Sequence, residues 1–271
     1  MSQFIPQDRA MSQNQLLTLL SDFGLSDVYV GVMKGEIALI NPHLTVIDLT
    51  HEIPPQSIAA ARFCLMSAYT SFPKGSVHVA VVDPGVGSKR RSLAIEFTQG
   101  FLVGPDNGIF SGVLSQCPAI TAVELTNPKY WKSPQPSRTF HGRDIFAPVG
   151  AHLASGVPIA QLGKQVDIKA LVQLTMPDVT STNTTITGCV QYIDRFGNLV
   201  TNIPGTTVQN KTWNVLVKGL TIPGCNTYSD VAPGNAITLI GSHGYIEIAV
   251  ANGNAQKLLQ LTWGVIVQVE V

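Results

Sequence analysis

The sequence predicts an α/β protein, with an N-terminal, mostly parallel sheet flanked by helices and a smaller C-terminal all-β, barrel-like domain. In the first half, apolar β-branched runs alternate with segments of helical spacing, which is the βαβ pattern of a parallel sheet. In the second half, short runs of alternating polarity are separated by Gly and Pro. Between them, residues 177–185 are rich in Ser, Thr and Asn and are predicted to form a linker.

The first domain is expected over residues 15–176 and opens with three strands joined by two helices. The strands are predicted at residues 16–20, 45–49 and 77–82, with helices at 29–40 and 58–69. This order favours right-handed crossovers between parallel strands. Residues 93–97 and 101–103 are predicted to form a hairpin around Gln99 and Gly100. A further strand is predicted at 121–125, and further helices at 110–114 and 145–153.

The second domain is expected over residues 186–271 and contains only strands. They are predicted at residues 186–193, 213–217, 236–240, 245–250 and 264–271. Short strands with turn residues between them are typical of a small barrel.

The charge composition limits the classes of partner. The 271 residues include 17 Lys and Arg and 17 Asp and Glu, so the formal net charge is zero. A neutral chain without a basic stripe is a poor candidate for binding nucleic acid or an anionic membrane surface. Because only 13% of residues are charged while 45% are hydrophobic, we expect part of the surface to be buried between subunits.

Several features predict a cytoplasmic protein. Residues 1–14 are polar, lack the pattern of a signal peptide and are expected to form a disordered tail. No apolar run approaches the roughly 18 residues of a membrane span. The four Cys have no paired spacing, which is typical of core thiols in a reducing compartment.

The most informative stretch is residues 77–90, where a β-branched run ends in Asp83. A turn containing Pro and two Gly follows at once, and then the cationic pair Lys89 and Arg90. A strand that carries a carboxylate to the edge of a sheet is typical of ligand sites in open α/β folds. A strand followed by a plain turn is the alternative.

Polar side chains gather at the C-terminal ends of four predicted strands. They are Asp22, Asp27, Asp48, His51, Asp83, Asp106 and Asn107. One interpretation is a binuclear metal site for phosphoester hydrolysis, made of Asp22, Asp48, His51, Asp83 and His141. The sequence lacks a local pair of residues at metal-ligand spacing, and the Gly and Pro turns favour an organic ligand, so the metal site is the lesser alternative.

The second domain carries a possible binding turn in residues 192–202. Asp194, Phe196 and Asn198 lie close together around a Gly. Phe196 could stack on a flat ring, Asn198 could form hydrogen bonds, and Asp194 could pair with a positive charge. A hairpin with an inward-facing aromatic ring is the alternative.

Seven ordered blocks of sequence carry a resemblance to a known family. The blocks are residues 21–31, 48–55, 83–91, 104–108, 139–148, 194–202 and 241–245. Through them the chain resembles the S-adenosyl-L-methionine (SAM) hydroxide adenosyltransferases, the hydrolytic relatives of the SAM-dependent fluorinase and chlorinase. The blocks run from about residue 16 to the end, so the resemblance covers nearly the whole chain.

The resemblance implies hydrolysis of SAM to adenosine and L-methionine, with water attacking the ribose C5′ and with neither metal nor cofactor. It implies a catalytic set of Asp83, Arg90 and His141. The halogenases carry Tyr at position 83 and Ser at position 142, where this chain has Asp and Gly, so the chain sides with the hydrolases. A non-catalytic SAM- or adenosine-binding module and a SAM-dependent halogenase remain the alternatives.

The resemblance also implies how substrate is held. Asp22, with Asp27 beside it, would bind the ribose diol. The methionine and adenine ends would be bound by Asp194, Phe196, Asn198 and Ser242. The family resemblance further implies a homotrimer, with each site between the first domain of one subunit and the second domain of its neighbour.

Two positions depart from the family pattern. Gln56 stands where relatives usually carry an aromatic residue after the Pro pair, and His243 stands where the fluorinase has Arg. Packing around the ligand at position 56 and the role of position 243 are therefore open.

Overall fold

A computed structural model describes residues 15–271 and divides the chain between Leu174 and Thr175 into two compact units. The tail expected at residues 1–14 lies outside the described residues. The segment predicted as a linker, residues 177–185, falls within the second unit and contains a short strand, β8 (Thr180–Ser181).

The first unit is built on a seven-stranded sheet in the order β2-β1-β3-β5-β4-β6-β7. Its strands are β1 (Leu16–Ser21), β2 (Thr45–Thr50), β3 (Ser76–Val81), β4 (Ser92–Phe97), β5 (Gly100–Pro105), β6 (Ala119–Glu124) and β7 (Lys164–Gln165). The first four in spatial order pair in parallel, and the other pairings are antiparallel. The predicted α/β class is confirmed, and the sheet is mixed because the β4–β5 hairpin returns β5 to the side of β3.

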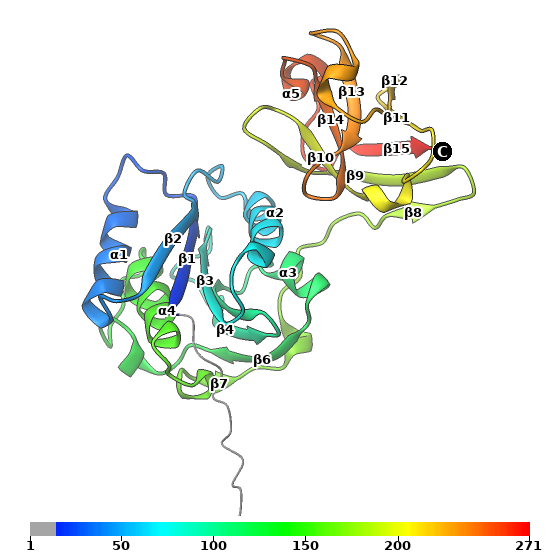
Figure 1. Cartoon of the computed structure of the whole chain (residues 1–271). Coiled ribbons are helices and arrows are strands. Elements are labelled where there is room, and N and C mark those ends of the chain that lie inside the picture. The colour runs from blue at the N-terminus through cyan, green and yellow to red at the C-terminus, as the bar shows by residue number, and fades with distance from the viewer. Residues whose placement is uncertain (1–14) are drawn as a thin grey trace, which may run out of the picture. The chain divides into compact units, whose positions relative to one another are not determined.

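Helices cover both faces of this sheet. They are α1 (Tyr29–Ile40), α2 (Ile58–Ala68), α3 (Ser111–Gln116) and α4 (Ala147–Ala154), with a π-helix, η3 (Gly142–Phe146), directly before α4. Short 3₁₀ turns complete the unit at η1 (Tyr69–Ser71), η2 (Pro128–Tyr130), η4 (Ile159–Gln161) and η5 (Ile168–Ala170). Figure 1 shows α1 and α4 on one face and α2 and α3 on the other.

Alternate strand residues form the core beneath α1 and α4. Leu17 of β1 and Val79 of β3 pack with Met33 of α1 in one buried cluster. Helix α4 approaches the sheet closely at Gly150, where a Cβ would lie 2.5 Å from Val79 Cγ2. This close packing fixes the start of α4, and with it η3 and His141, beside the end of β3.

The topology brings several loops to one edge of the sheet. Because β2, β1, β3 and β5 are parallel, their carboxyl ends meet there. Strand β4 starts at the same edge because it runs antiparallel to β5, so the loop of residues 82–91 both begins and ends there. The sequence motifs of the first half therefore converge.

The second unit is an antiparallel, nearly closed barrel-like sheet in the order β12-β11-β15-β9-β10-β14-β13, as predicted. Besides β8, its elements are β9 (Thr185–Ile193), β10 (Leu199–Pro204), β11 (Asn214–Val217), β12 (Leu220–Pro223), β13 (Ala236–Ile240), β14 (Tyr245–Val250), β15 (Ile266–Glu270), α5 (Ala255–Leu259) and the 3₁₀ turns η6 (Gly205–Thr207) and η7 (Tyr228–Asp230). A bridge between Gly224 and Thr238 joins the segment after β12 to β13. Strands β10 and β12 and helix α5 were not predicted.

Candidate active site

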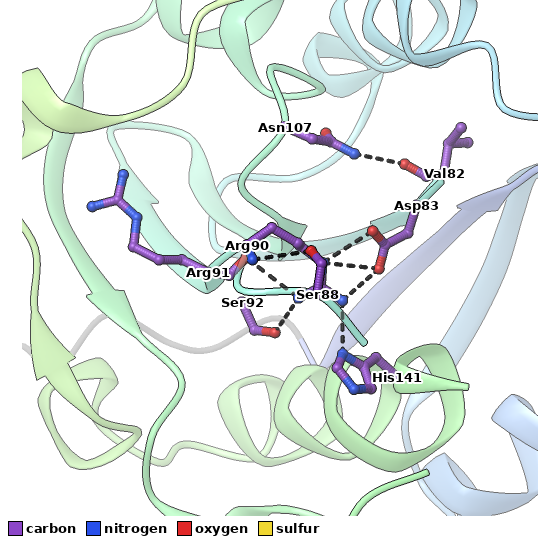
Figure 2. A network of polar contacts seen from close by, with 8 residues as sticks. All are labelled: Val82, Asp83, Ser88, Arg90, Arg91, Ser92, Asn107 and His141. Carbon is purple, nitrogen blue, oxygen red and sulfur yellow. Dashed lines mark hydrogen bonds and ion pairs between the residues drawn. The ribbon is translucent and has the colours of Figure 1, made fainter. Parts of the chain in front are cut away.

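The loop of residues 82–91 is anchored at both ends to the end of β5. Asn107 Nδ2 donates a hydrogen bond to the Val82 carbonyl over 2.8 Å, as Figure 2 shows, and Arg91 Nε donates to Asp106 Oδ2 over 2.8 Å. These contacts hold a loop with tight internal turns in a fixed position at the sheet edge.

Gly87 allows this loop to lie against a distant segment. Its φ is +75°, and a Cβ there would lie 2.3 Å from the Arg138 carbonyl oxygen. Only glycine combines that backbone conformation with such a close approach. The contact brings the loop beside the segment that carries His141.

Of the three residues predicted to be catalytic, Arg90 contacts both of the others. Its Nε donates to Asp83 Oδ1 over 2.9 Å and its Nη2 to Oδ2 over 2.5 Å, while Nη2 also lies 2.7 Å from His141 Nδ1 (Figure 2). Its Nη1 donates to Ser92 Oγ over 2.6 Å, and its guanidinium lies 5.3 Å from the centroid of the Phe146 ring. The side chains of Arg90 and Asp83 are only 10% and 6% exposed. A buried bidentate pair of this kind is strong and geometrically fixed.

The protonation of His141 follows from its partners. An arginine can only donate hydrogen bonds, so His141 Nδ1 must accept, and a neutral ring then carries its proton on Nε2. Burial, together with the positive charge of Arg90, lowers the pKa of His141, although Asp83 and Asp144 partly oppose this. His141 is therefore neutral at neutral pH.

A cavity of about 430 Å³ opens beside this cluster. Asp83 and His141 line it, whereas Arg90 is not among the lining residues within the described chain. The lining residues from the loop of residues 82–91 are Asp83, Pro84 and Val86. The arrangement places a carboxylate and a neutral imidazole at the cavity wall, with a guanidinium joining them.

The predicted ribose ligands separate in the structure. Asp22 lines the cavity, and its Oδ2 accepts a hydrogen bond of 2.7 Å from the Gln56 backbone N–H. Asp27 is exposed and lies in a different groove beside Leu25 and Val28. Gln56 itself lines the cavity, with a left-handed backbone at φ +65°.

Three aromatic rings outside the predicted set of site residues form another part of the cavity wall. Phe23, Tyr29 and Phe140 contact one another with centroid distances of 5.7, 5.8 and 5.2 Å, mostly edge to face. All three belong to sequence blocks that carry the resemblance, and this position is the one sequence feature that could have predicted them as site residues. An aromatic wall suits an organic ligand with an apolar or cationic part.

In the second unit, Asp194, Phe196 and Asn198 share one turn. Asp194 Oδ1 accepts hydrogen bonds from the backbone N–H groups of Phe196 and Asn198, over 2.9 and 2.8 Å, and Oδ2 accepts one from Asn198 Nδ2 over 3.1 Å. The carboxylate thus shapes the turn, and Phe196 extends from it with 73% of its surface exposed. The alternative of an inward-facing Phe196 is wrong.

Ser242 lies in another turn of the same unit, between β13 and β14, and is exposed. Its neighbour His243 is held from both sides. His243 Nδ1 accepts from the Tyr245 backbone N–H over 3.2 Å, and Nε2 lies 3.1 Å from Oε2 of the buried Glu247.

Residues 15–271 contain no candidate metal centre: no three His, Cys, Asp or Glu side chains in this range gather closely enough to hold a metal ion. No helix in the range has the length and apolar character needed to cross a bilayer.

The chain matches two family models. That of the SAM hydroxide adenosyltransferase N-terminal domain matches residues 17–163, and that of the C-terminal domain matches residues 188–268. The chain is 38% identical to a protein of Salinispora tropica named (R)-S-adenosyl-L-methionine hydrolase, over 94% of this chain and 97% of the relative. It is 27% identical to a fluorinase of an Actinoplanes species, over 87% and 91% of the two chains.

A crystal structure of a conserved protein from Thermotoga maritima has the same fold. It superposes with a TM-score of 0.87 at 33% sequence identity and covers 93% of this chain and 99% of that one. Both domain models and the full-length similarity agree with the order of the sequence blocks. The chain belongs to the SAM hydroxide adenosyltransferase family.

Proposed function

We propose that this protein hydrolyses SAM to adenosine and L-methionine by attack of water on the ribose C5′. The observation that carries the proposal is the Arg90 guanidinium, which joins Asp83 and His141 at the wall of a cavity that Asp22 also lines. Identity of 38% to a relative named as a SAM hydrolase supports the same reaction.

The reaction demands little acid catalysis. A bond forms between the water oxygen and C5′, the C5′–S bond breaks, and its electron pair converts the sulfonium into the neutral thioether of methionine. One proton leaves the water. Because the leaving group departs neutral, the task of the protein is to place the water in line with the C5′–S bond, and positioning of this kind can supply about 7–11 kcal/mol.

Asp83 is the proposed proton acceptor. Its Oδ2 accepts hydrogen bonds from both Nε and Nη2 of Arg90, but Oδ1 accepts only one, from Nε, and so has a second lone pair that can face a water. His141 keeps Nδ1 engaged by Arg90, so its contribution is the Nε2–H donor, which can orient the water. Arg90 acts through these two side chains as a positioning residue.

The proposed substrate contacts rest on the lining of the cavity for the first unit and on the family resemblance for the second unit. Asp22 binds the ribose hydroxyls, and the rings of Phe23, Tyr29 and Phe140 flank the ligand. Asp194, Phe196, Asn198 and Ser242 bind the methionine and adenine ends. Asp27 takes no direct contact in this proposal, because it lies outside the cavity of its own unit. Neither a metal nor a cofactor enters the reaction, since SAM supplies its own leaving group.

The proposed assembly is a cytoplasmic homotrimer with each site shared between neighbouring subunits. The family resemblance implies it, and the low content of charged residues favours it. An apolar groove on the first unit gives further support: Leu25 and Val28, which line it, are 67% and 73% exposed. Exposed apolar side chains that lie together favour a contact site.

The direct test is incubation of the purified protein with SAM, followed by chromatography for adenosine. We expect adenosine and methionine in equal amounts; a yield no higher than that of the enzyme-free blank would refute the hydrolase. Binding of SAM without turnover would favour the binding module. Formation of a halogenated nucleoside in the presence of chloride or fluoride would favour the halogenase, and loss of activity with a chelator would favour the metal site.

A further inference from the structure

We infer that His51 is a positioning residue for ribose recognition, because its buried imidazole holds the turn after β1 so that Asp22 faces the cavity. The inference rests on the proposed function, in which Asp22 binds the ribose hydroxyls. His51 itself does not line the cavity, as far as the described residues go.

The imidazole joins the ends of two neighbouring strands. Ser21, the last residue of β1, and His51, just beyond β2, are 0% and 3% exposed. Ser21 Oγ lies 2.7 Å from His51 Nδ1 and accepts a hydrogen bond of 3.3 Å from the Phe23 backbone N–H. The hydroxyl is thus able to donate to Nδ1 while it accepts from the turn, which fixes the ring and the turn together.

The other ring nitrogen lies beside a carboxylate. His51 Nε2 lies 3.1 Å from Asp48 Oδ1, without the alignment of a hydrogen bond, so the contact is electrostatic. Asp48 Oδ2 in turn accepts from Lys34 Nζ of α1 over 2.6 Å. Burial alone would raise the pKa of Asp48, but Lys34 and His51 together hold it below its usual value, so the carboxylate is charged.

Backbone contacts complete the connection to Asp22. The Gly24 N–H donates to the His51 carbonyl over 2.8 Å, and the Gln56 N–H donates to Asp22 Oδ2 over 2.7 Å. Gln56 holds a left-handed backbone to do so, which is uncommon for a residue other than glycine and is a feature of constrained ligand sites. The loops after β1 and β2 are therefore tied together on both sides of Asp22.

The order of contacts resembles a Ser–His–Asp nucleophilic triad, but its geometry excludes that role. A nucleophilic serine must expose its hydroxyl to substrate. Ser21 is fully buried, and its Oγ is occupied by His51 and by the Phe23 N–H. The set therefore acts on the position of Asp22 and not on the reacting atoms.

The test compares the affinities of adenosine and 2′-deoxyadenosine, measured by titration calorimetry in wild type and variants. Wild type should prefer adenosine. Asp22→Asn should remove the preference, and its affinity ratio gives the largest effect that the other variants can have. We expect Ser21→Ala and His51→Gln to reduce the ratio of the two affinities by about tenfold, the size expected when a hydrogen bond to a charged group is lost. Their kcat for SAM should change less than their KM.

The chain offers a matched control on the same strand. Thr18 Oγ1 lies 2.8 Å from His78 Nδ1, and both residues are buried away from the cavity. Thr18→Val removes an equivalent hydroxyl–imidazole contact and should lower the melting temperature without changing the affinity ratio.

The outcomes separate the inference from the function. If Ser21→Ala and His51→Gln keep the wild-type ratio while Asp22→Asn loses it, the positioning role of His51 is wrong and the function stands. If Thr18→Val lowers the ratio as much as Ser21→Ala, the effect is general destabilisation and the inference is also overturned. If wild type neither binds adenosine nor hydrolyses SAM, the proposed function itself is wrong.

Discussion

At the scale of single residues, Asp83 carries the chemistry in our proposal. Asp83→Asn keeps the shape of the side chain and one acceptor for Arg90, but an amide cannot take a proton from water. We expect kcat to fall by about 10²–10⁴, the usual contribution of a general base. Adenosine release at saturating SAM measures it.

Ser88→Ala is the control for this substitution. Ser88 lies in the same loop, is exposed and only accepts a hydrogen bond from the Arg90 backbone N–H. Its kcat should stay within about threefold of wild type, the effect of losing one neutral hydrogen bond. An Asp83→Asn protein as active as Ser88→Ala would remove Asp83 from the mechanism.

The state of His141 predicts the pH dependence of the reaction. Burial and the charge of Arg90 lower its pKa below the ordinary value of 6.5, so the neutral ring predominates at pH 6.5 and above. Below that, protonation removes the acceptor for Arg90 and places two cations side by side. The activity should therefore be level above pH 6.5 and fall only in more acidic solution. The contribution of neutral His141 to the free energy of unfolding should likewise be lost only as the pH falls below 6.5.

A profile of kcat between pH 5 and 8 checks this prediction. His141→Asn provides the comparison, because the Asn amide oxygen can accept from Arg90 and does not titrate. The acidic decrease that belongs to His141 should be absent in that variant. A wild-type profile with its midpoint above pH 6.5 would contradict a neutral, acceptor histidine.

At this scale the sequence named the residues of the proposed site, but not their geometry. Asp83 and Arg90 are seven positions apart and His141 is 51 positions further on, and the family resemblance grouped them. That Arg90 joins the other two, without lining the cavity, depends on side-chain directions that no spacing encodes. The same holds for Asp22 and Asp27, which are close in sequence yet lie in different hollows.

At the scale of elements, the loop between β3 and β4 determines the geometry of the site. Gly87→Ala should disturb it, because the new Cβ would meet the Arg138 carbonyl oxygen at 2.3 Å in a left-handed backbone. We expect a loss of about 1–3 kcal/mol in the free energy of unfolding. A shift of about 1 Å in the loop would also lower kcat by about 10²-fold.

Gly85→Ala is the matched control in the same loop. A Cβ at Gly85 would make ordinary contacts, 3.5 Å from both Arg90 Cγ and Ser88 Oγ. Urea denaturation gives the free energy of unfolding of the two variants, and steady-state kinetics gives their kcat. Equal stability and equal kcat would show that the close approach at Gly87 does not control the site.

Elements were predicted best where the chain is regular. The strands and helices that surround the cavity have strong apolar periodicity and were found close to their observed bounds. Strand β10 was missed because it follows the Gly197 turn inside a segment interpreted as a binding loop, and β12 because four residues ending in Pro223 carry too little periodicity. The antiparallel half of the first sheet arises from the β4–β5 hairpin, which the Gln99-Gly100 turn predicted. Its pairing with β3 on one side and β6 on the other is not encoded in any local pattern.

At the scale of the whole molecule, the proposed trimer makes each chain depend on its neighbour for a complete active site. Residues proposed to act on water belong to the first unit, and residues proposed to hold the methionine and adenine ends belong to the second. If each site combines the first unit of one subunit with the second unit of its neighbour, no isolated chain can complete a site. Native mass measurement should then give three copies, and a monomer would contradict the assembly.

Mixing two defective variants tests whether the sites are shared. Asp83→Asn damages only the first unit, and Phe196→Ala removes a ring that is 73% exposed and so should not unfold the second. In a mixed trimer, a first unit from the Phe196→Ala chain can meet a second unit from the Asp83→Asn chain, which restores an intact site. The activity of the co-expressed chains at low SAM should therefore exceed the sum of the separate activities.

The control is a mixture of Asp83→Asn with His141→Asn. Both substitutions lie in the first unit, so this mixture should show no gain. Activity equal to the sum in both mixtures would mean that each site belongs to a single chain.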